Sequence, residues 1–392
     1  MNLDKKMIKN NIPRIRFNNF KAFWVEKKIA DIVKISAGGD VDKVKLKESG
    51  QYPVIANALT NKGIVGFYDD YKVKAPAVTV TGRGDVGYAV ARHENFTPVV
   101  RLLTLQSENI DVDYLENQIN SMRILNESTG VPQLTAPQLG NYKVYHPEID
   151  EQSVIGSLFS TLDDILASYK DNLANYQSIK VTMLSKMFPK AGQTVPEIRL
   201  DGFEDRWEEK CIGELADIVR GASPRPIQDP KWFDSNSEIG WLRISDVTNQ
   251  NGRIHSLEQK ISKLGQEKTR VLTEPHLLLS IAATVGKPVV NYVKTGVHDG
   301  FLIFMNPKFD REFMFQWLEM FREKWNRYGQ PGSQVNLNSD IVKNQKILIP
   351  SMEEQRAIGT YFSNLDNLIN SHQEKISQLE TLKKKLLQDM FI

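Results

Sequence analysis

The sequence has a single cysteine and almost no excess of charge of one sign, and both shortages restrict what the protein can be. Cys211 has no second cysteine to pair with, so the fold contains no disulfide framework and no cysteine-rich zinc site. Fifty basic residues face 48 acidic residues, which leaves a formal charge of +2 on a chain of 392 residues. A polybasic coat for nucleic acid and an acidic tail are therefore both excluded.

Long hydrophobic runs are also missing. No stretch approaches the roughly 18 to 20 apolar residues that a membrane helix needs, and the mean hydropathy is -0.38. The first residues lack the apolar core of a signal peptide. We therefore expect a cytoplasmic protein with no membrane contact.

Motifs that carry chemistry are scarce. The six histidines lie too far apart for a metal-ligand spacing, and no nucleophile is arranged with a histidine and an acid as in a hydrolase. Residues 82–87 match the dinucleotide pattern G-x-G-x-x-G, but a β-prone run follows where that pattern requires a helix. We interpret the segment as a glycine-rich loop between two strands, and we expect no metal, no cofactor and no catalytic site in this chain.

What the chain does have is an internal repeat. Four ordered blocks match later blocks at offsets that rise from 183 to 203 residues, so the second copy carries about twenty extra residues in its interior, as expected for loop insertions in a diverged duplicate. The first block joins residues 13–24 with 196–207, and the last joins 147–188 with 350–391 without a gap. The chain is therefore two copies of one unit.

Each copy changes character part-way. Its first part alternates short apolar runs with glycine, proline and asparagine, which is typical of strands and turns, and contains one stretch of helical spacing, at 112–125 or 313–325. Its second part, at 151–188 or 354–391, has apolar residues at steps of three and four and predicts a long amphipathic helix. We expect an α+β domain followed by a helix in each copy.

The two helices are expected to pair. A lone helix cannot bury its apolar stripe, so the simplest arrangement is an antiparallel coiled coil within the chain, which serves as a spacer between the domains. The alternative is that each helix binds other proteins separately. The predicted organisation, an internal pseudo-twofold duplication, is as follows: a globular domain at 1–150, a spacer helix at 151–190, a second globular domain at 191–350 and a second spacer helix at 351–392.

Both globular domains carry polar residues of the kinds that read base edges. Arginine and lysine recognise guanine, and asparagine and glutamine recognise adenine. The candidate DNA contacts are Asn57, Asn61, Lys62, Arg83, Arg92, Gln133 and Thr135 in the first copy, and Arg243, Asn249, Asn251, Arg253, Lys287, Gln334 and Asn336 in the second.

Two duplicated motifs give the chain a family resemblance. One is Pro-x-x-x-Glu-Gln-x-x-Ile-Gly at 147–156 and 350–359, and the other is Pro-x-Ile-Arg-(Phe/Leu)-x-x-Phe-x-x-x-Trp at 13–24 and 196–207. In this order, and over essentially the whole chain, they resemble the specificity subunits of type I restriction-modification systems.

The resemblance implies a non-catalytic subunit that recognises DNA sequence. It implies two target recognition domains, each reading one half of a bipartite asymmetric site on double-stranded DNA, held apart by the paired helices. It implies two methyltransferase subunits and two restriction or translocase subunits as partners, with S-adenosylmethionine, ATP and magnesium bound on those partners. The helix residues implied in docking the partners are Glu151, Gln152, Leu162, Ile165, Glu354, Gln355, Leu365 and Ile369.

Two alternatives stay open. A coiled-coil scaffold without a DNA role would leave the polar loops without a function. A stand-alone nuclease would use Glu208 and Lys210, which together with Asp201 or Asp205 resemble the end of a metal-dependent nuclease motif. A solvated run of charges is the plainer interpretation of that segment.

Overall fold

The computed structural model describes the whole chain except residues 1–10, 123, 125–132, 191, 282–283 and 329–336. Its contacts divide the chain into two compact units, Met1–Asp171 with His372–Ile392, and Asn172–Ser371. The predicted organisation gave each helix a segment of its own. The structure instead divides each long helix between the two units, because each helix packs one half of its length on each globular domain.

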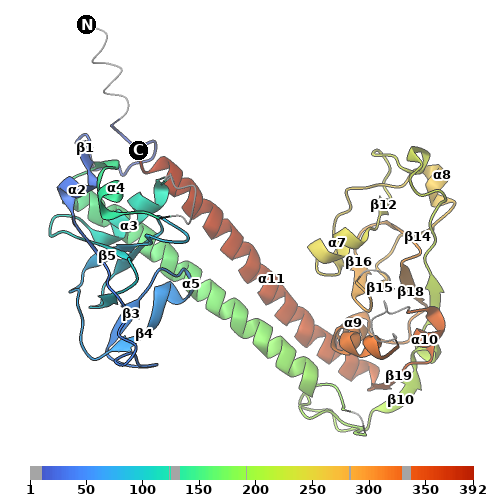
Figure 1. Ribbon diagram of the computed structural model, residues 1–392. Coiled ribbons are helices and arrows are strands. Elements are labelled where there is room, and N and C mark those ends of the chain that lie inside the picture. The colour runs from blue at the N-terminus through green and yellow to red at the C-terminus, as the bar shows by residue number, and fades with distance from the viewer. Residues whose placement is uncertain (1–10, 123, 125–132, 191, 282–283, 329–336) are drawn as a thin grey trace. The chain divides into compact units, whose positions relative to one another are not determined.

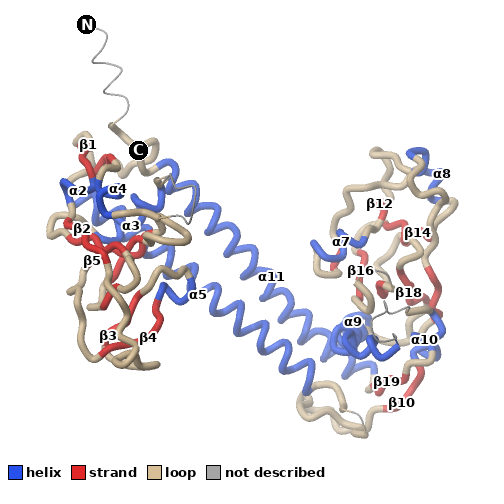
Figure 2. Tube along the Cα trace, viewed as in Figure 1, coloured by secondary structure: helices blue, strands red, loops and turns tan. Residues whose placement is uncertain are grey.

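The two units repeat one α+β fold, whose strands and helices are distinguished in Figure 2. The first unit contains, in chain order, β1 (Val25–Lys28), α2 (Ile29–Ile32), β2 (Lys34–Ala37), β3 (Tyr52–Ile55), η2 (Thr60–Gly63), β4 (Ile64–Tyr68), β5 (Ala77–Val80), β6 (Ala89–Arg92), β7 (Thr97–Pro98), β8 (Leu103–Gln106), α3 (Val112–Ser121), α4 (Ala136–Gly140), β9 (Lys143–His146) and the start of α5 (Ile149–Lys186). The second unit contains β10 (Glu208–Cys211), α6 (Ile212–Leu215), β11 (Asp217–Arg220), η3 (Pro230–Trp232), β12 (Gly240–Trp241), α7 (Ile244–Asn249), β13 (Arg253–Ile254), α8 (Lys263–Gln266), β14 (Arg270–Leu272), β15 (Leu277–Ser280), β16 (Pro288–Asn291), β17 (Thr295–Val297), β18 (Phe301–Met305), α9 (Arg311–Phe321), η4 (Arg322–Tyr328), α10 (Ser339–Lys343), β19 (Lys346–Ile349) and the start of α11 (Met352–Asp389). The predicted duplication and the predicted α+β class are both confirmed.

The central sheets of the two units correspond strand by strand. The first sheet has the order β2-β8-β5-β6, and the second has β11-β18-β15-β16 with β13 added at one edge. Their registers correspond as well, since Val80 pairs with Leu103 and Leu279 pairs with Leu302, each pair shifted by 199 residues. Among the described residues, β6 has no added neighbour at the edge where β13 lies beside β16.

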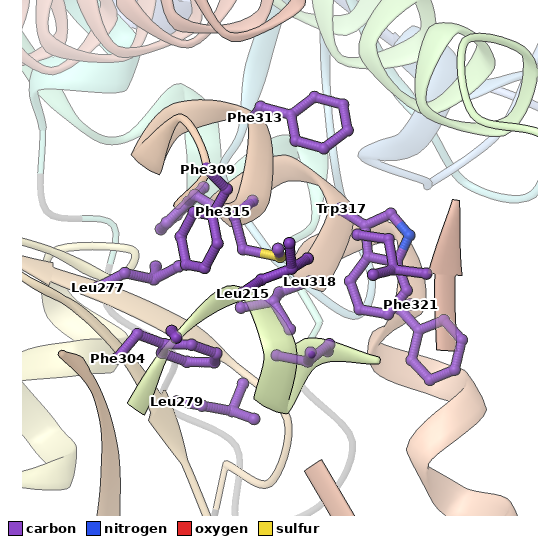
Figure 3. Packing of buried hydrophobic residues seen from close by; sticks show 14 of the residues in the cluster. Leu215, Leu277, Leu279, Phe304, Phe309, Phe313, Phe315, Trp317, Leu318 and Phe321 are labelled. Carbon is purple, nitrogen blue, oxygen red and sulfur yellow. The ribbon is translucent and has the colours of Figure 1, made fainter. Parts of the chain in front are cut away.

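Apolar strands and one helix form the core of each domain. Both β5 and β15 are buried along their whole length, as their continuous apolar sequence predicts. In the second unit, aromatic and aliphatic side chains of α9 pack on the sheet, among them Phe315 and Leu318 from the helix and Leu279 and Phe304 from the strands (Figure 3). The helical spacing seen in the sequence at 313–325 is therefore the buried face of α9 up to Phe321, followed by the buried Trp325 on η4.

The glycine-rich segment 82–87 joins β5 to β6, two antiparallel neighbours. Gly84 and Gly87 have φ values of 79° and 91°, which favour glycine, and the Gly87 N–H donates to the Thr81 carbonyl at 2.8 Å to close the turn. A strand follows the turn, so the helix N-terminus of a dinucleotide site is absent from this segment. The interpretation as a loop between strands is confirmed.

The long helices α5 and α11 run antiparallel (Figure 1). In the first unit, Asp163 bonds Lys383 at 2.5 Å and Lys170 bonds Glu380 at 2.7 Å, so contacts move back along α11 as they advance along α5. In the second unit, Lys180 bonds Asp366 at 2.5 Å. Asp163 matches Asp366 in the repeat, and Lys180 matches Lys383, so the same ion pair occurs once in each unit. The predicted pairing of the two helices is confirmed.

An arginine and a glutamate from the two duplicated motifs lock each domain to the start of a long helix. Arg16 donates two hydrogen bonds to the Glu151 carboxylate, both at 2.7 Å, and Arg199 donates two to Glu354 at 2.7 and 2.8 Å. Both glutamates are 2% or less exposed. Bidentate pairs of this kind are strong and directional, so the duplicated motifs hold the fold together.

The glutamine and glycine of the same motif also hold the domain against the start of the long helix. Gln152 accepts the N–H of Asp111 at 3.2 Å, and Gln355 accepts that of Asp310 at 2.9 Å. A Cβ atom at Gly156 would lie 2.4 Å from the Asp111 carboxylate, so the close approach requires glycine there. Gly359 meets Asp310 in the same way, at 2.7 Å.

The duplicated Met-Phe pair at the end of each long helix closes the core. Phe188 lies 5.5 Å from Phe313 and 6.3 Å from Phe362 between ring centroids. Phe391 lies 5.5 Å from Tyr114 and 5.8 Å from Phe159. Each domain is therefore fastened to the first turns of one helix and to the last turn of the other.

Within the described part of the chain, no helix combines the length and the apolar character that crossing a membrane requires.

Candidate nucleic-acid interface

Loops at one end of the central sheet bring several predicted residues together in the first unit. The Asn57 side chain donates to the Val100 carbonyl and accepts the N–H of Gly82 at 2.7 Å. Arg83 forms a β-bridge with Gln133, whose side chain accepts from Arg101 at 3.4 Å. We call residues 57, 82–85, 99–101 and 133–135 the first loop corner.

The first loop corner presents positive charge to solvent. Arg83 and Arg101 are both exposed, and neither forms a salt bridge within the part of the chain that the structure describes. Val100 and Arg101 have φ values of 52° and 59°, a backbone conformation that L side chains rarely adopt and that functional loops often contain. Sequence reasoning missed Arg101, because nothing in its neighbourhood marks the turn.

The second unit carries a cavity of about 700 Å³ at the equivalent corner. It is lined by the loop 223–228, by Trp241 and Arg243, and by His298 and Asp299. The Ser223 hydroxyl donates to the Asp299 carboxylate at 2.8 Å, and Arg225 bonds the same carboxylate at 3.2 Å while 83% exposed. We call residues 221–228, 241–243 and 298–300 the second loop corner.

The protonation of His298 and Asp299 follows from their surroundings. Burial lowers the pKa of His298, so its ring is neutral, and Nδ1 accepts the N–H of Gly300 at 2.8 Å. The proton is therefore on Nε2. Burial alone would raise the pKa of Asp299, but the Ser223 hydroxyl and the neighbouring His298 and Arg220 together hold it below its ordinary value. The corner thus offers a hydrogen-bond donor and a carboxylate beside an exposed arginine.

The two loop corners occupy the same place in the repeated fold. The N–H of Gly38 donates to the Leu102 carbonyl at 2.8 Å, and the N–H of Gly221 donates to the Phe301 carbonyl at 2.9 Å. These bonds join the same two loops in both units, because residues 38 and 221 follow β2 and β11, and residues 102 and 301 begin β8 and β18 or immediately precede them.

Several predicted residues of the first copy lie elsewhere. Arg92 donates to Thr79 at 2.9 Å and to the Lys62 carbonyl at 2.8 Å, and burial lowers the pKa of Arg92 to about 10. Asn61 and Lys62 are exposed on the turn η2. Thr135 belongs to the corner but accepts the N–H of Gln138 as the N-cap of α4.

Two predicted cations of the second copy form ion pairs inside the protein, and their contact with DNA stays a prediction. Lys287 bonds Glu319 at 2.5 Å and is 12% exposed. Arg253 bonds Glu312 at 2.5 Å and Asp366 at 3.3 Å, and is 15% exposed. Both face the helices, so neither charge is available at the corner.

The other predicted residues of the second copy differ in their environment. Arg243 lines the corner cavity, with Asp246 at 2.9 Å and Glu258 at 3.4 Å. Asn249 is exposed at the end of α7. Asn251 accepts from Lys287 at 2.8 Å. Gln334 and Asn336 lie outside the described residues.

The helix residues implied in docking are largely used within the chain. Glu151, Gln152, Glu354 and Gln355 are at most 3% exposed and already form hydrogen bonds that hold the domains to the helices, and their role in docking stays a prediction. Leu162 and Leu365 are buried as well. Of the set, Ile165 is 38% exposed and Ile369 is half-buried.

The residues of the nuclease alternative lie on a different face. Glu208 and Lys210 form an exposed ion pair at 2.8 Å on β10, with the glutamate 70% exposed. In the described part of the chain, no group of three or more histidine, cysteine, aspartate or glutamate side chains is arranged to hold a metal ion.

Comparison with known families decides what the repeated unit is. The family model for the type I restriction modification DNA specificity domain matches residues 22–175 and, a second time, residues 204–381. The chain belongs to this family. The two matches coincide with the two copies of the repeat.

Relatives in the family are distant in sequence. The specificity subunit of the type I restriction enzyme MjaVIII from Methanocaldococcus jannaschii is 22% identical over 281 residues, which are 67% of this chain and 64% of that protein. A putative type I specificity subunit from Mycoplasma pneumoniae is 26% identical over 159 residues, 39% of this chain and 43% of that one. The chain thus spans less than two thirds of the length of these relatives.

Solved structures share the fold over nearly the whole chain. The crystal structure of an S subunit of a type I restriction-modification system from M. genitalium has a TM-score of 0.71 and 14% identity, and the match covers 97% of this chain and 99% of that one. A chain from a structure on complex assembly and conformational transition of a type I system has a TM-score of 0.53 and 15% identity, covering 93% and 96%.

Proposed function

We propose that this protein is the sequence-reading subunit of a type I restriction-modification enzyme, and that each loop corner reads one half of a bipartite, asymmetric site on double-stranded DNA. The observation that carries the proposal is the recurrence of an arginine-bearing loop corner at the same place in two copies of a family domain. A reader built twice can read two half-sites, and different residues at the two corners make those half-sites different.

The chemistry of the corners suits base recognition. Exposed arginines with no acidic partner, here Arg83 and Arg101, can donate two hydrogen bonds to a guanine edge. Asn57 and Gln133 are amides of the kind that pair with adenine, and they are already fixed in orientation by protein hydrogen bonds. In the second corner, Arg225 can donate to guanine and the Asp299 carboxylate can accept from a cytosine amino group.

The catalytic steps are proposed to lie on partner chains. Methyltransferase subunits would contribute S-adenosylmethionine, and restriction or translocase subunits would contribute ATP and magnesium. The near-neutral charge of this chain fits such a division, because much of the phosphate contact in a complex can come from the partners.

The test uses the complete chain expressed with its methyltransferase subunit, and the readout is the map of methylated adenines across the host genome. Arg83→Ala and Arg101→Ala should relax or change one half-site, and Arg225→Ala should change the other. Loss of one good base contact costs about 1 to 3 kcal/mol, so methylation rates at the original sites should fall roughly 5- to 150-fold.

Arg14→Ala is the matched control, because Arg14 is 85% exposed and lies outside both corners. It should leave the methylation map unchanged. If the wild-type complex methylates no defined sequence, the proposed function is wrong. If it does, and all three corner variants give the wild-type map, the reading surface lies elsewhere on the domains.

A further inference from the structure

A second cavity lies in the first unit, away from the loop corner. It measures about 520 Å³ and is bordered by β6, α3 and the two long helices. Its acidic lining residues are Asp113 and Glu116 from α3 and Asp163 and Asp164 from α5, and its basic ones are Lys62 and Lys383, with His93 beside Asp113. Carboxylates outnumber cations at this place, and the proposed DNA reading gives the cavity no task.

Glu116 is the most deeply placed of these carboxylates. Burial, reinforced by the neighbouring Asp163 and Asp113 and opposed by the Ala91 N–H and by Lys383, raises the pKa of Glu116 to about 7. Among the described residues, Glu116 forms no salt bridge. Lys383 and Arg92 act on Glu116 through space without forming an ion pair with it, and a largely buried carboxylate that no cation contacts is costly to keep charged.

The second unit shows what fills the same place in the other copy. Asp163 corresponds to Asp366, Asp113 to Glu312, and His93 to Tyr292. In the second unit Arg253 enters among them, bonding Glu312 at 2.5 Å, Asp366 at 3.3 Å and the Tyr292 hydroxyl at 2.9 Å.

The guanidinium of Arg253 is also enclosed by an aromatic ring. Its central carbon lies 4.1 Å from the centroid of Phe315, which occupies the repeat position of Glu116. Burial by itself would lower the pKa of Arg253, but Glu312 and Tyr292 outweigh it and raise that pKa. The site in the second unit is therefore complete, with a cation held between two carboxylates.

The first unit has the carboxylates and lacks the arginine. Arg253 comes from the added strand β13, and the matching residue in the repeat is Ile64, which belongs to β4. Asp163 keeps its bond to Lys383 at 2.5 Å through Oδ1, as Asp366 keeps Lys180, but its Oδ2 accepts no hydrogen bond from the described residues. The side chain of Asp163 is 41% exposed, compared with 14% for Asp366.

We propose that the cavity of the first unit is a socket for an arginine side chain of a partner protein, which would bind Asp113, Glu116 and Asp163 as Arg253 binds their counterparts within the chain. Carboxylates repel phosphate, so the socket does not take nucleic acid. It is lined in part by α5 and α11, and it shares no lining residue with the first loop corner. The identity of the partner as the methyltransferase subunit rests on the proposed function.

The first test measures the affinity of the full-length chain for its methyltransferase subunit by calorimetry. Asp163→Asn combined with Glu116→Gln removes two of the three carboxylates proposed to bind the arginine, and Ala91→Trp fills the cavity by bulk. Each should weaken binding at least tenfold, whereas Asp171→Asn, an exposed acid on α5 outside the cavity, should not. Circular dichroism melts of each variant confirm that the chain is folded.

A second measurement tests whether the cavity binds a guanidinium group when no partner protein is present. Ethylguanidinium is titrated into full-length chain labelled with ¹³C at alanine methyl groups, and the NMR signal of Ala91 is followed. We expect a saturable shift in the wild type and no shift in the Asp163→Asn, Glu116→Gln variant. Undiminished partner binding in the cavity variants overturns the proposal, even if ethylguanidinium binds. If the wild-type chain forms no complex with the methyltransferase subunit, the proposed function is wrong. In that case the socket is tested by ethylguanidinium alone, and it is overturned if the wild-type chain shows no shift.

Discussion

The two copies of the repeat place the same carboxylate in two different environments. Asp366 is surrounded by Lys180, by Arg253 and by Gln316, whose amide donates at 2.9 Å. Among the described residues, Asp163 is bonded only by the matching lysine, Lys383. The backbone registers are shared, so the difference lies in one added strand and the arginine it carries. It teaches that duplication preserved the arrangement of the carboxylates, while the residue at one repeat position, Ile64 in the first copy and Arg253 in the second, decides whether the chain fills the site.

The largest effect should come from emptying the filled site. Arg253→Ala removes the buried cation that Glu312 binds and leaves Asp366 with Lys180 alone, and removal of one member of such a buried pair costs about 3 to 5 kcal/mol. Urea unfolding of the full chain should show this loss. Arg206→Ala, at an exposed arginine of the same unit, is the control and should cost under about 0.5 kcal/mol. Equal losses of unfolding free energy in the two variants would mean that the contacts of Arg253 do not stabilise the second unit.

A smaller effect should come from neutralising the unfilled site. Because the pKa of Glu116 is about 7 in the folded chain and 4.5 ordinarily, the folded state binds the proton more tightly between those values. Stability of the first unit should therefore fall as pH rises from 4.5 to 7 and beyond, by up to about 3 kcal/mol.

Glu116→Gln should abolish that fall, and Asp171→Asn should leave it in place. Chemical unfolding at several pH values measures both. A pH dependence that survives Glu116→Gln unchanged would assign the effect to another group and would weaken the contrast drawn between the copies.

The smallest effect should be alike in both copies. Asp111 and Asp310 cap α3 and α9 by accepting the N–H of Tyr114 and of Phe313, each at 2.9 Å. Replacing either by alanine should cost about 1 kcal/mol, detected as faster hydrogen exchange in the capped helix. If the two losses of stability differ by more than about 1 kcal/mol, the copies differ in how they fix α3 and α9 as well as at the acidic cavity.

The fold was largely predictable from the sequence because the repeat could be read residue by residue. Blocks at rising offsets placed the insertions, and the steps of three and four predicted both long helices. The sequence did not predict how the helices are shared between the units. That depends on contacts such as Phe188 with Phe362 and Phe391 with Tyr114, which join residues far apart in the chain.

The site was predicted less well, for a specific physical reason. Residue type alone made Arg253 and Lys287 look like DNA contacts, but their acidic partners come from α9 and α11 and are 59, 113 and 32 residues away. Arg83, Asn57 and Gln133 do lie together at one loop corner, and their contact with DNA stays a prediction. Arg101 was missed because nothing in its local sequence predicts the turn on which it lies, whereas the prolines beside Arg225 did mark a loop that could have pointed to it.

The carboxylate of Asp366 has a consequence for cooperativity. It receives Lys180 from one long helix and sits on the other, and it receives Arg253 and Gln316 from the globular domain. The Asp366 carboxylate therefore joins α5, α11, β13 and α9. A shift of β13 or α9 changes the position of this carboxylate and with it the alignment of the two long helices. Replacement of Arg253 in β13 should therefore also weaken the packing of the two long helices in this unit, because Asp366 joins the strand to both of them.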